Sequence, residues 1–159
     1  MPSLSRTMVV VCAIFEATRL SISPGWSQTV APITPSGLNT QVDLSAAPSR
    51  DTVQYDITGG TRAGTNLFHS FGEFSVPNGN TANFLNDTGL TTTNILGRVT
   101  GGNVSNIFGT IQTTGFRNAN LFLMNPAGIV FGPTASLNVG GSVTFTTADY
   151  LRLDKVGGS

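Results

Sequence analysis

Short apolar runs separated by tight corners are the main pattern of this sequence from about residue 93 onward. The clearest example is Asn120–Gly132, NLFLMNPAGIVFG, in which Asn-Pro-Ala-Gly divides two apolar runs. Pro126 suits the second place of a type I turn and Gly128 follows two residues later, so a corner is predicted here. Further apolar runs lie at 137–139 and 143–145, each after a corner marked by glycine. This order of short strands and corners is typical of a coiled β solenoid.

Alternation within these runs predicts which side chains point inward, because successive residues of a strand face opposite ways. The positions predicted to face the interior are Ile107, Gly109, Ile111, Leu121, Leu123, Ile129, Phe131, Leu137, Val139, Val143 and Phe145. Phe122, Met124 and Val130 break the rule, because they are apolar on the outward face. Another chain segment or a partner is therefore expected to cover that face.

The first half of the chain is less regular. Tyr55–Thr58 reads as a strand that ends at Gly59-Gly60, and Asn66–Phe74 as a strand with imperfect alternation. Thr81–Leu85 fits one short helical turn or a loop. Residues 28–50 are rich in proline, serine and threonine and are predicted to form an extended lead-in to the domain.

A β-sandwich and a barrel compete with the solenoid as all-β solutions. Antiparallel hairpins favour two-residue turns of the Asn-Gly type. Asn78-Gly79 is the only such dipeptide, and the later corners lack one, which favours the solenoid. At roughly 20 residues a coil and about 4.8 Å of rise, about six coils are expected.

Charge is scarce and balanced. Only 10% of residues are charged, and eight basic residues match eight acidic ones. A soluble domain ordinarily has about 25% charged residues. A nucleic-acid-binding protein needs a basic face, so a nucleic-acid partner is not expected.

The N-terminus resembles an export signal. Arg6 precedes a short apolar run, Met8–Phe15, and small residues at Gly25 and Ser27 suit cleavage before Gln28. Residues 1–27 are therefore predicted to be a signal peptide, with a buried strand as the other interpretation of the apolar run. The run is shorter than the ~20 residues that span a bilayer, so stable membrane insertion is not expected. Cleavage would also remove Cys12, the only cysteine, and with it any disulfide or thiolate site.

Catalytic chemistry has little support. His69 is the only histidine, which leaves no histidine-rich metal site and no support for a Ser-His-Asp triad. No two acidic residues of the mature chain are close enough in sequence to suggest a glycosidase pair, although stacked coils could bring distant ones together. Phosphate-loop and dinucleotide motifs do not occur. No catalytic, cofactor-binding or metal-binding residues are predicted, and the protein is not expected to be an enzyme.

Three segments carry a family resemblance: NLFHSF from Asn66, NILGRV from Asn94, and NLFLMNPAGIVFGPTASLNVGGSV from Asn120. They resemble the N-terminal secretion domain of the filamentous haemagglutinin family, with the closest likeness to cyanobacterial members. The resemblance covers roughly residues 41–153. It implies an all-β, right-handed parallel β-helix with an extended N-terminal cap region. The β-helical domain is here predicted to cover residues 51–159.

The resemblance also implies the biology of two-partner secretion. The domain would begin an adhesin or exoprotein that reaches the cell surface or medium through the periplasm. An outer-membrane transporter barrel with periplasmic POTRA domains would recognise it, and a host or surface glycan is a further implied partner in cell adhesion. The other interpretations are a β-helical carbohydrate-active enzyme and a truncated gene fragment that is not exported, since the chain is short for the family.

The corner is the expected recognition site. The residues predicted to form this recognition site for the transporter are Asn125, Pro126, Gly128, Ile129, Phe122 and Val130. Asn125 has two interpretations, an Asx side chain that closes the turn onto its own backbone and a surface contact. The family most often has a second asparagine where Ala127 stands. If the backbone at position 127 were in the left-handed region, alanine would be less favourable there than asparagine.

Overall fold

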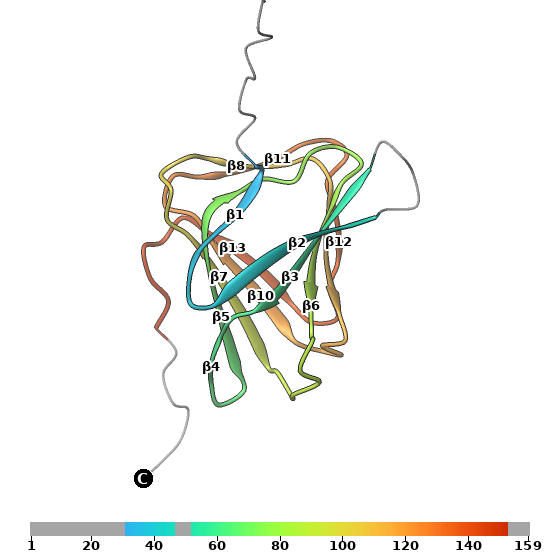
Figure 1. Ribbon diagram of the computed structural model, residues 1–159. Coiled ribbons are helices and arrows are strands. Elements are labelled where there is room, and N and C mark those ends of the chain that lie inside the picture. The colour runs from blue at the N-terminus through green and yellow to red at the C-terminus, as the bar shows by residue number, and fades with distance from the viewer. Residues whose placement is uncertain (1–30, 47–51, 153–159) are drawn as a thin grey trace, which may run out of the picture.

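The structure is a computed structural model that describes residues 31–46 and 52–152 (Figure 1). The predicted signal peptide, 1–27, lies outside the described residues. This part of the chain contains β-strands and no helix, and therefore no helix able to cross a bilayer. The strands are β1 (Ile33–Gly37), β2 (Thr40–Ala46), β3 (Val53–Gly59), β4 (Thr61–Ala63), β5 (Asn66–Phe74), β6 (Thr81–Leu85), β7 (Asn94–Val99), β8 (Ser105–Ile107), β9 (Thr110–Thr114), β10 (Asn120–Met124), β11 (Ile129–Phe131), β12 (Ser136–Asn138) and β13 (Val143–Thr146).

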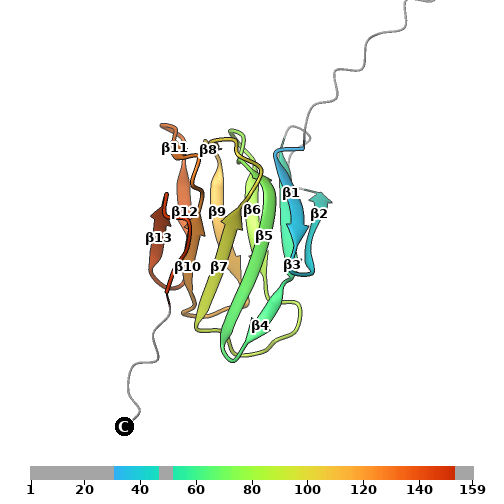
Figure 2. The same cartoon turned by 90° about the vertical axis from the view of Figure 1, so that its left-hand side faces the viewer.

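The strands stack into the three faces of a parallel β-helix (Figures 1 and 2). Sheet A has the order β1-β5-β7-β10-β13, with β4 paired to β5. Sheet B has the order β12-β9-β6-β3-β2, and sheet C contains β11 and β8. Each complete coil passes from sheet A through sheet C to sheet B before returning to sheet A. The predicted solenoid is confirmed, and the sandwich and barrel are not.

The predicted coil length and coil number are wrong. Asn66, Asn94 and Asn120 lie side by side in register on β5, β7 and β10, with sequence separations of 28 and 26 residues. The described residues therefore make three coils, beginning at β5, β7 and β10, and β13 begins a further turn on sheet A. The observed coils are longer than predicted because the loops that join one face to the next contain more residues than expected.

Thr81–Leu85 is a strand, β6, rather than a helical turn or loop. It pairs in parallel with β3 on one side and with β9 on the other. Ala82 and Phe84 face the core and are fully buried. Such a short strand gives too little alternation to identify it locally, so its conformation comes from its two neighbours.

The interior follows the predicted alternation. Aromatic rings fill the first coil, where Phe71, Phe74 and Phe84 pack with centroids 5.0 to 6.2 Å apart. Aliphatic side chains fill the next coils, and Ile95, Ile107, Ile111, Leu121 and Leu123 have no exposed surface. Inward side chains of successive coils thus stack along the axis of the helix.

The N-terminal end of the helix is capped by β1 and β2, which lie within the predicted lead-in. Both strands are antiparallel to their neighbours, β1 to β5 and β2 to β3. The chain turns between them at Leu38 and Asn39, both with positive φ. Ile33 is buried in the core and Val42 packs against it, so the cap shields the aromatic first coil from water.

At the opposite end, two residues predicted to face the interior are exposed. Phe131 and Leu137 have exposed fractions of 45% and 49%. They point as the alternation predicts, but within the described residues no further strand pairs with β11 or β12 beyond β8 and β9. Phe131 instead packs on Phe145, with ring centroids 4.7 Å apart.

The outward apolar face of sheet A is covered in part by the chain itself. Residues 147–152 turn back outside sheet A next to β13 and β10 (Figures 1 and 2). Leu96 and Met124 are buried, although both point outward. The expectation that this face needs cover is therefore met for β7 and the end of β10.

Candidate functional site

The predicted corner joins β10 of sheet A to β11 of sheet C. The amide N of Gly128 donates a 3.0 Å hydrogen bond to the carbonyl of Asn125, which closes a four-residue turn with Pro126 in second place. Gly128 has a φ of 120° and Ala127 does not have a positive φ. A type II turn needs a positive φ at the third place, so the turn is not of that type. Ala127 is therefore not in the left-handed backbone region, and alanine causes no backbone strain at this position.

Asn125 commits every polar atom of its side chain to the protein. Its Oδ1 accepts a 2.9 Å hydrogen bond from the amide of Ala127, which is the predicted Asx arrangement. Its Nδ2 donates to the carbonyl of Asn103 at 2.9 Å and to the hydroxyl of Ser105 at 2.8 Å. The residue is only 1% exposed. Asn125 thus ties its own turn to the corner one coil earlier.

The main chain strengthens this connection between corners. The amide of Ser105 donates to the carbonyl of Gly128 at 3.0 Å, and the amide of Asn125 donates to the carbonyl of Thr146 at 3.0 Å. The corner is thereby fixed to the coils on both sides. The geometry supports the structural interpretation of Asn125, and its contact with a transporter stays a prediction.

The other predicted site residues differ in exposure. Pro126 is exposed, Val130 is 49% exposed, and Ile129 is half-buried against the core. Phe122 lies apart from the turn, half-buried on the outward face of sheet A between Leu96 and Thr144. The structure therefore brings the turn residues and Val130 together, with Phe122 on the adjoining face.

Sequence reasoning missed the partners of the corner. Ser105 is buried and receives the Asn125 amide, and Val104 lies under Gly128, 3.6 Å from the place of an added Cβ. Val104 and Phe108 are exposed apolar residues on the same small face as Val130. These partners belong to the previous coil, so no local signal in the sequence links them to the turn. A cavity of about 150 Å³ lies next to the turn and is lined by residues including Arg98, Thr100, Pro126 and Ala127.

Two carboxylates do come together, which the sequence alone could not select. Asp43 on β2 lies opposite Asp56 on β3. Partial burial raises the pKa of the Asp56 carboxyl, but hydrogen bonds that it accepts, including those from Asn83 and Gln54, outweigh burial and hold it below its usual value. A carboxyl held in the charged form is unsuited to be a general acid. Across residues 31–46 and 52–152, no three acidic, histidine or cysteine side chains gather as metal ligands.

His69 is a core residue. It is 2% exposed and lies against Phe71 and Phe84, with centroid distances of 6.1 and 5.6 Å. Burial lowers its pKa to about 4; the negative charge of Asp87 opposes this shift, and the positive charge of Arg62 adds to it. Its Nδ1 has no hydrogen-bond partner among the described residues. The imidazole is thus neutral and buried in the first coil.

Comparisons with known proteins agree with this fold. A family model described as the TPS secretion domain matches residues 31–158. Among solved structures, a filamentous hemagglutinin secretion domain is similar, with 25% identity and a TM-score of 0.52. The similarity covers 74% of this chain and 42% of that one, so the chain spans less than half of the protein it resembles. No match is found among curated proteins. Because the family model spans most of the sequence, the chain belongs to the TPS secretion domain family.

Proposed function

We propose that this chain is the non-enzymatic N-terminal secretion module of a filamentous-haemagglutinin-like exoprotein or adhesin. An outer-membrane two-partner secretion transporter recognises it at a corner surface, which we define as Pro126, Ala127, Val130 and Val104. Asn125 and Gly128 shape this surface, while Ile129 anchors it to the core. The family membership supports the secretion role. The exposed apolar groups next to a rigid turn are the reason for choosing this surface as the recognition site.

The chemistry of the corner surface suits a protein partner. Val130 and Val104 are 49% and 41% exposed, and they flank a turn whose backbone is held by hydrogen bonds to both neighbouring coils. A rigid apolar surface loses little conformational entropy on binding. Recognition through the shape of the corner would not require a second asparagine at position 127.

The finer elements of the proposal come from the family resemblance. They are a signal peptide at residues 1–27, passage through the periplasm, docking to POTRA domains, and delivery to the cell surface or medium. Adhesion to a host or surface glycan and the likeness to cyanobacterial members of the family also come from this resemblance. The carbohydrate-active enzyme is disfavoured, because Asp56, which lies opposite Asp43, has a pKa held below its usual value and is unsuited to be a general acid.

Export through a co-expressed transporter of the same organism tests the proposal. Val130→Ser removes an exposed apolar contact while leaving the hydrogen bonds of the corner intact. We expect the variant to accumulate in the periplasm at the expense of the medium, with its free energy of unfolding within about 0.5 kcal/mol of the native value.

Leu44→Ser is the matched control, because Leu44 is 72% exposed on β2 of the cap, away from the corner. Its export should equal that of the native chain. Equal appearance of both variants in the medium would overturn the corner surface. Failure of the native chain to leave the periplasm with any transporter would instead overturn the secretion role.

A further inference from the structure

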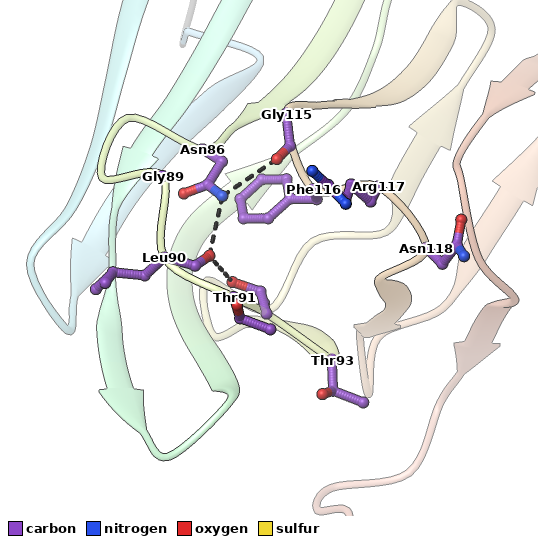
Figure 3. Close-up of a pocket in the computed structure, with 10 residues that line it drawn as sticks. Asn86, Gly89, Leu90, Thr91, Thr93, Gly115, Phe116, Arg117 and Asn118 are labelled. Atoms are coloured by element: carbon purple, nitrogen blue, oxygen red, sulfur yellow. Dashed lines mark hydrogen bonds between the residues drawn. The ribbon is translucent and has the colours of Figure 1, made fainter.

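A second polar cavity lies away from the corner surface, where sheet B returns to sheet A. Its volume is about 590 Å³, within the range of small-molecule sites. Two loops border it, residues 86–93 of the first coil and 115–118 of the second (Figure 3). The loop of the first coil is the longer one, and this difference creates the hollow.

Hydrogen bonds hold the two loops in place. Asn86 spans them, since its Nδ2 donates to the carbonyl of Leu90 at 3.0 Å and to that of Gly115 at 3.2 Å (Figure 3). Arg62 donates to the hydroxyl of Thr92, which lines the cavity, at 2.8 Å and to that of Thr88 at 3.3 Å. The walls are therefore set before any ligand arrives, which lowers the cost of binding.

Arg117 occupies a place that favours glycine. The amide of Ala119 donates to the carbonyl of Phe116 at 3.1 Å, so Arg117 is the second residue of a turn, and its φ is 52°. A positive φ strains any residue with a Cβ, and glycine is the usual solution at this place in such turns. No hydrogen bond or ion pair is assigned to its guanidinium among the described residues, and the side chain is exposed. A strained arginine with free donors at a cavity indicates a binding role.

The remaining lining narrows the class of ligand. Thr91, Thr93 and Asn118 offer groups that both donate and accept hydrogen bonds, which match the hydroxyls of a sugar. None of the lining residues is acidic, and Arg117 supplies one charge for a single anionic group. We propose that this cavity binds an acidic saccharide, with Arg117 holding the carboxylate of a uronic acid and the threonine and asparagine groups holding its hydroxyls.

Titration of the full chain with digalacturonic acid, followed by backbone amide NMR, tests the proposal. We expect shifts at residues 86–93 and 115–118, and weaker binding of the methyl ester, which keeps the hydroxyls but loses the charge. Arg117→Gly should lower the affinity about tenfold or more, as loss of a charge-assisted hydrogen bond does. Because glycine relieves the positive φ, the thermal midpoint of this variant should equal or exceed the native one.

Arg98→Ala is the control, because Arg98 is an exposed arginine on β7 that does not line this cavity. It should bind digalacturonic acid as the native chain does. Arg117→Lys keeps the charge without the planar fork and should bind with intermediate affinity. Absence of digalacturonic acid binding, unchanged affinity in Arg117→Gly, or equally tight binding of inorganic phosphate at these loops would each overturn the proposal.

Discussion

The side-chain amide of Asn120 donates a 3.1 Å hydrogen bond from Nδ2 to Oδ1 of Asn94, its neighbour one coil earlier. Asn94 in turn donates to Oδ1 of Asn66 at 2.8 Å. The amide of Ser142 closes the far end by donating to Oδ1 of Asn120 at 3.0 Å. This asparagine ladder sits at the start of β5, β7 and β10 and fixes the register in which the coils of sheet A stack.

Asn94→Ala should be costly, because it removes the donor to Asn66 and the acceptor of Asn120 together. Loss of half-buried partners on both sides predicts a fall of about 1 to 3 kcal/mol in the free energy of unfolding. Urea unfolding monitored by circular dichroism measures it. Asn103→Ala is the control, since Asn103 Nδ2 makes one exposed hydrogen bond, to Glu73. Equal costs for the two variants would show that the ladder contributes nothing beyond a surface contact.

The ladder also explains an error of the sequence-based expectation. The strands from residue 93 onward were predictable because alternation is a local property of each strand. The coil length is also written in the sequence, because Asn66, Asn94 and Asn120 each begin an apolar run and mark the true repeat. The predicted coil length was too short because it ignored the loops that join one face to the next.

At the corner, too, local features were predictable from the sequence and contacts between coils were not. Its turn was predictable from Pro126 and Gly128, since turn geometry depends on adjacent residues. Its supporting contacts were not, because Ser105 and Asn103 come from the previous coil. Burial was also misjudged at Phe131 and Leu137, because side-chain direction follows from alternation but burial depends on the next coil.

A double-mutant cycle at Asn125 and Ser105 should reveal coupling between adjacent corners. Asn125→Ala is expected to lower the free energy of unfolding by about 2 kcal/mol, because the Ser105 hydroxyl and the Asn103 carbonyl lose their hydrogen-bond donor. Ser105→Ala alone should cost about 1 kcal/mol. The double variant should cost less than the two single changes together by about 0.5 to 1 kcal/mol, measured by chemical unfolding. Additive costs would indicate that the hydrogen bond between these two side chains does not stabilise the fold.

His69 should make the protein less stable in acid. Its pKa is about 4 in the fold and near 6.5 when unfolded, so between these values the unfolded chain binds a proton that the folded chain does not. The contribution of neutral His69 is fully present above about pH 6.5 and is lost as the pH falls toward 4. The loss amounts to about 3 kcal/mol across this window.

His69→Phe removes the titrating group while keeping an aromatic ring next to Phe71 and Phe84. The unfolding free energy of this variant should depend less steeply on pH between 4 and 6.5 than that of the native chain. Any dependence left should come from the carboxylates, such as Asp56. Parallel pH profiles for the two proteins would show that the His69 proton is not linked to folding.

Gly109→Ala should be among the most damaging single substitutions, because the backbone turns tightly from sheet C into sheet B at this position. A Cβ at Gly109 would collide with the carbonyl oxygens of Asn80 and Pro77, which belong to the previous coil. The amide of Gly109 also donates to the carbonyl of Val76 at 2.9 Å, so the main chain cannot move away freely. We expect a loss of about 3 kcal/mol or more, measured by chemical unfolding.

Gly64→Ala separates this clash from the general effect of replacing glycine. Gly64 lies in the turn between β4 and β5, with a φ of 59° and no atom within 4 Å of the place of an added Cβ. Alanine there meets only the strain of the left-handed backbone, which costs about 1 to 2 kcal/mol. An equal or larger loss in Gly64→Ala would mean that backbone conformation, rather than close packing, sets the cost of replacing glycine. A clearly larger loss in Gly109→Ala would show that successive coils approach too closely at this corner for any side chain.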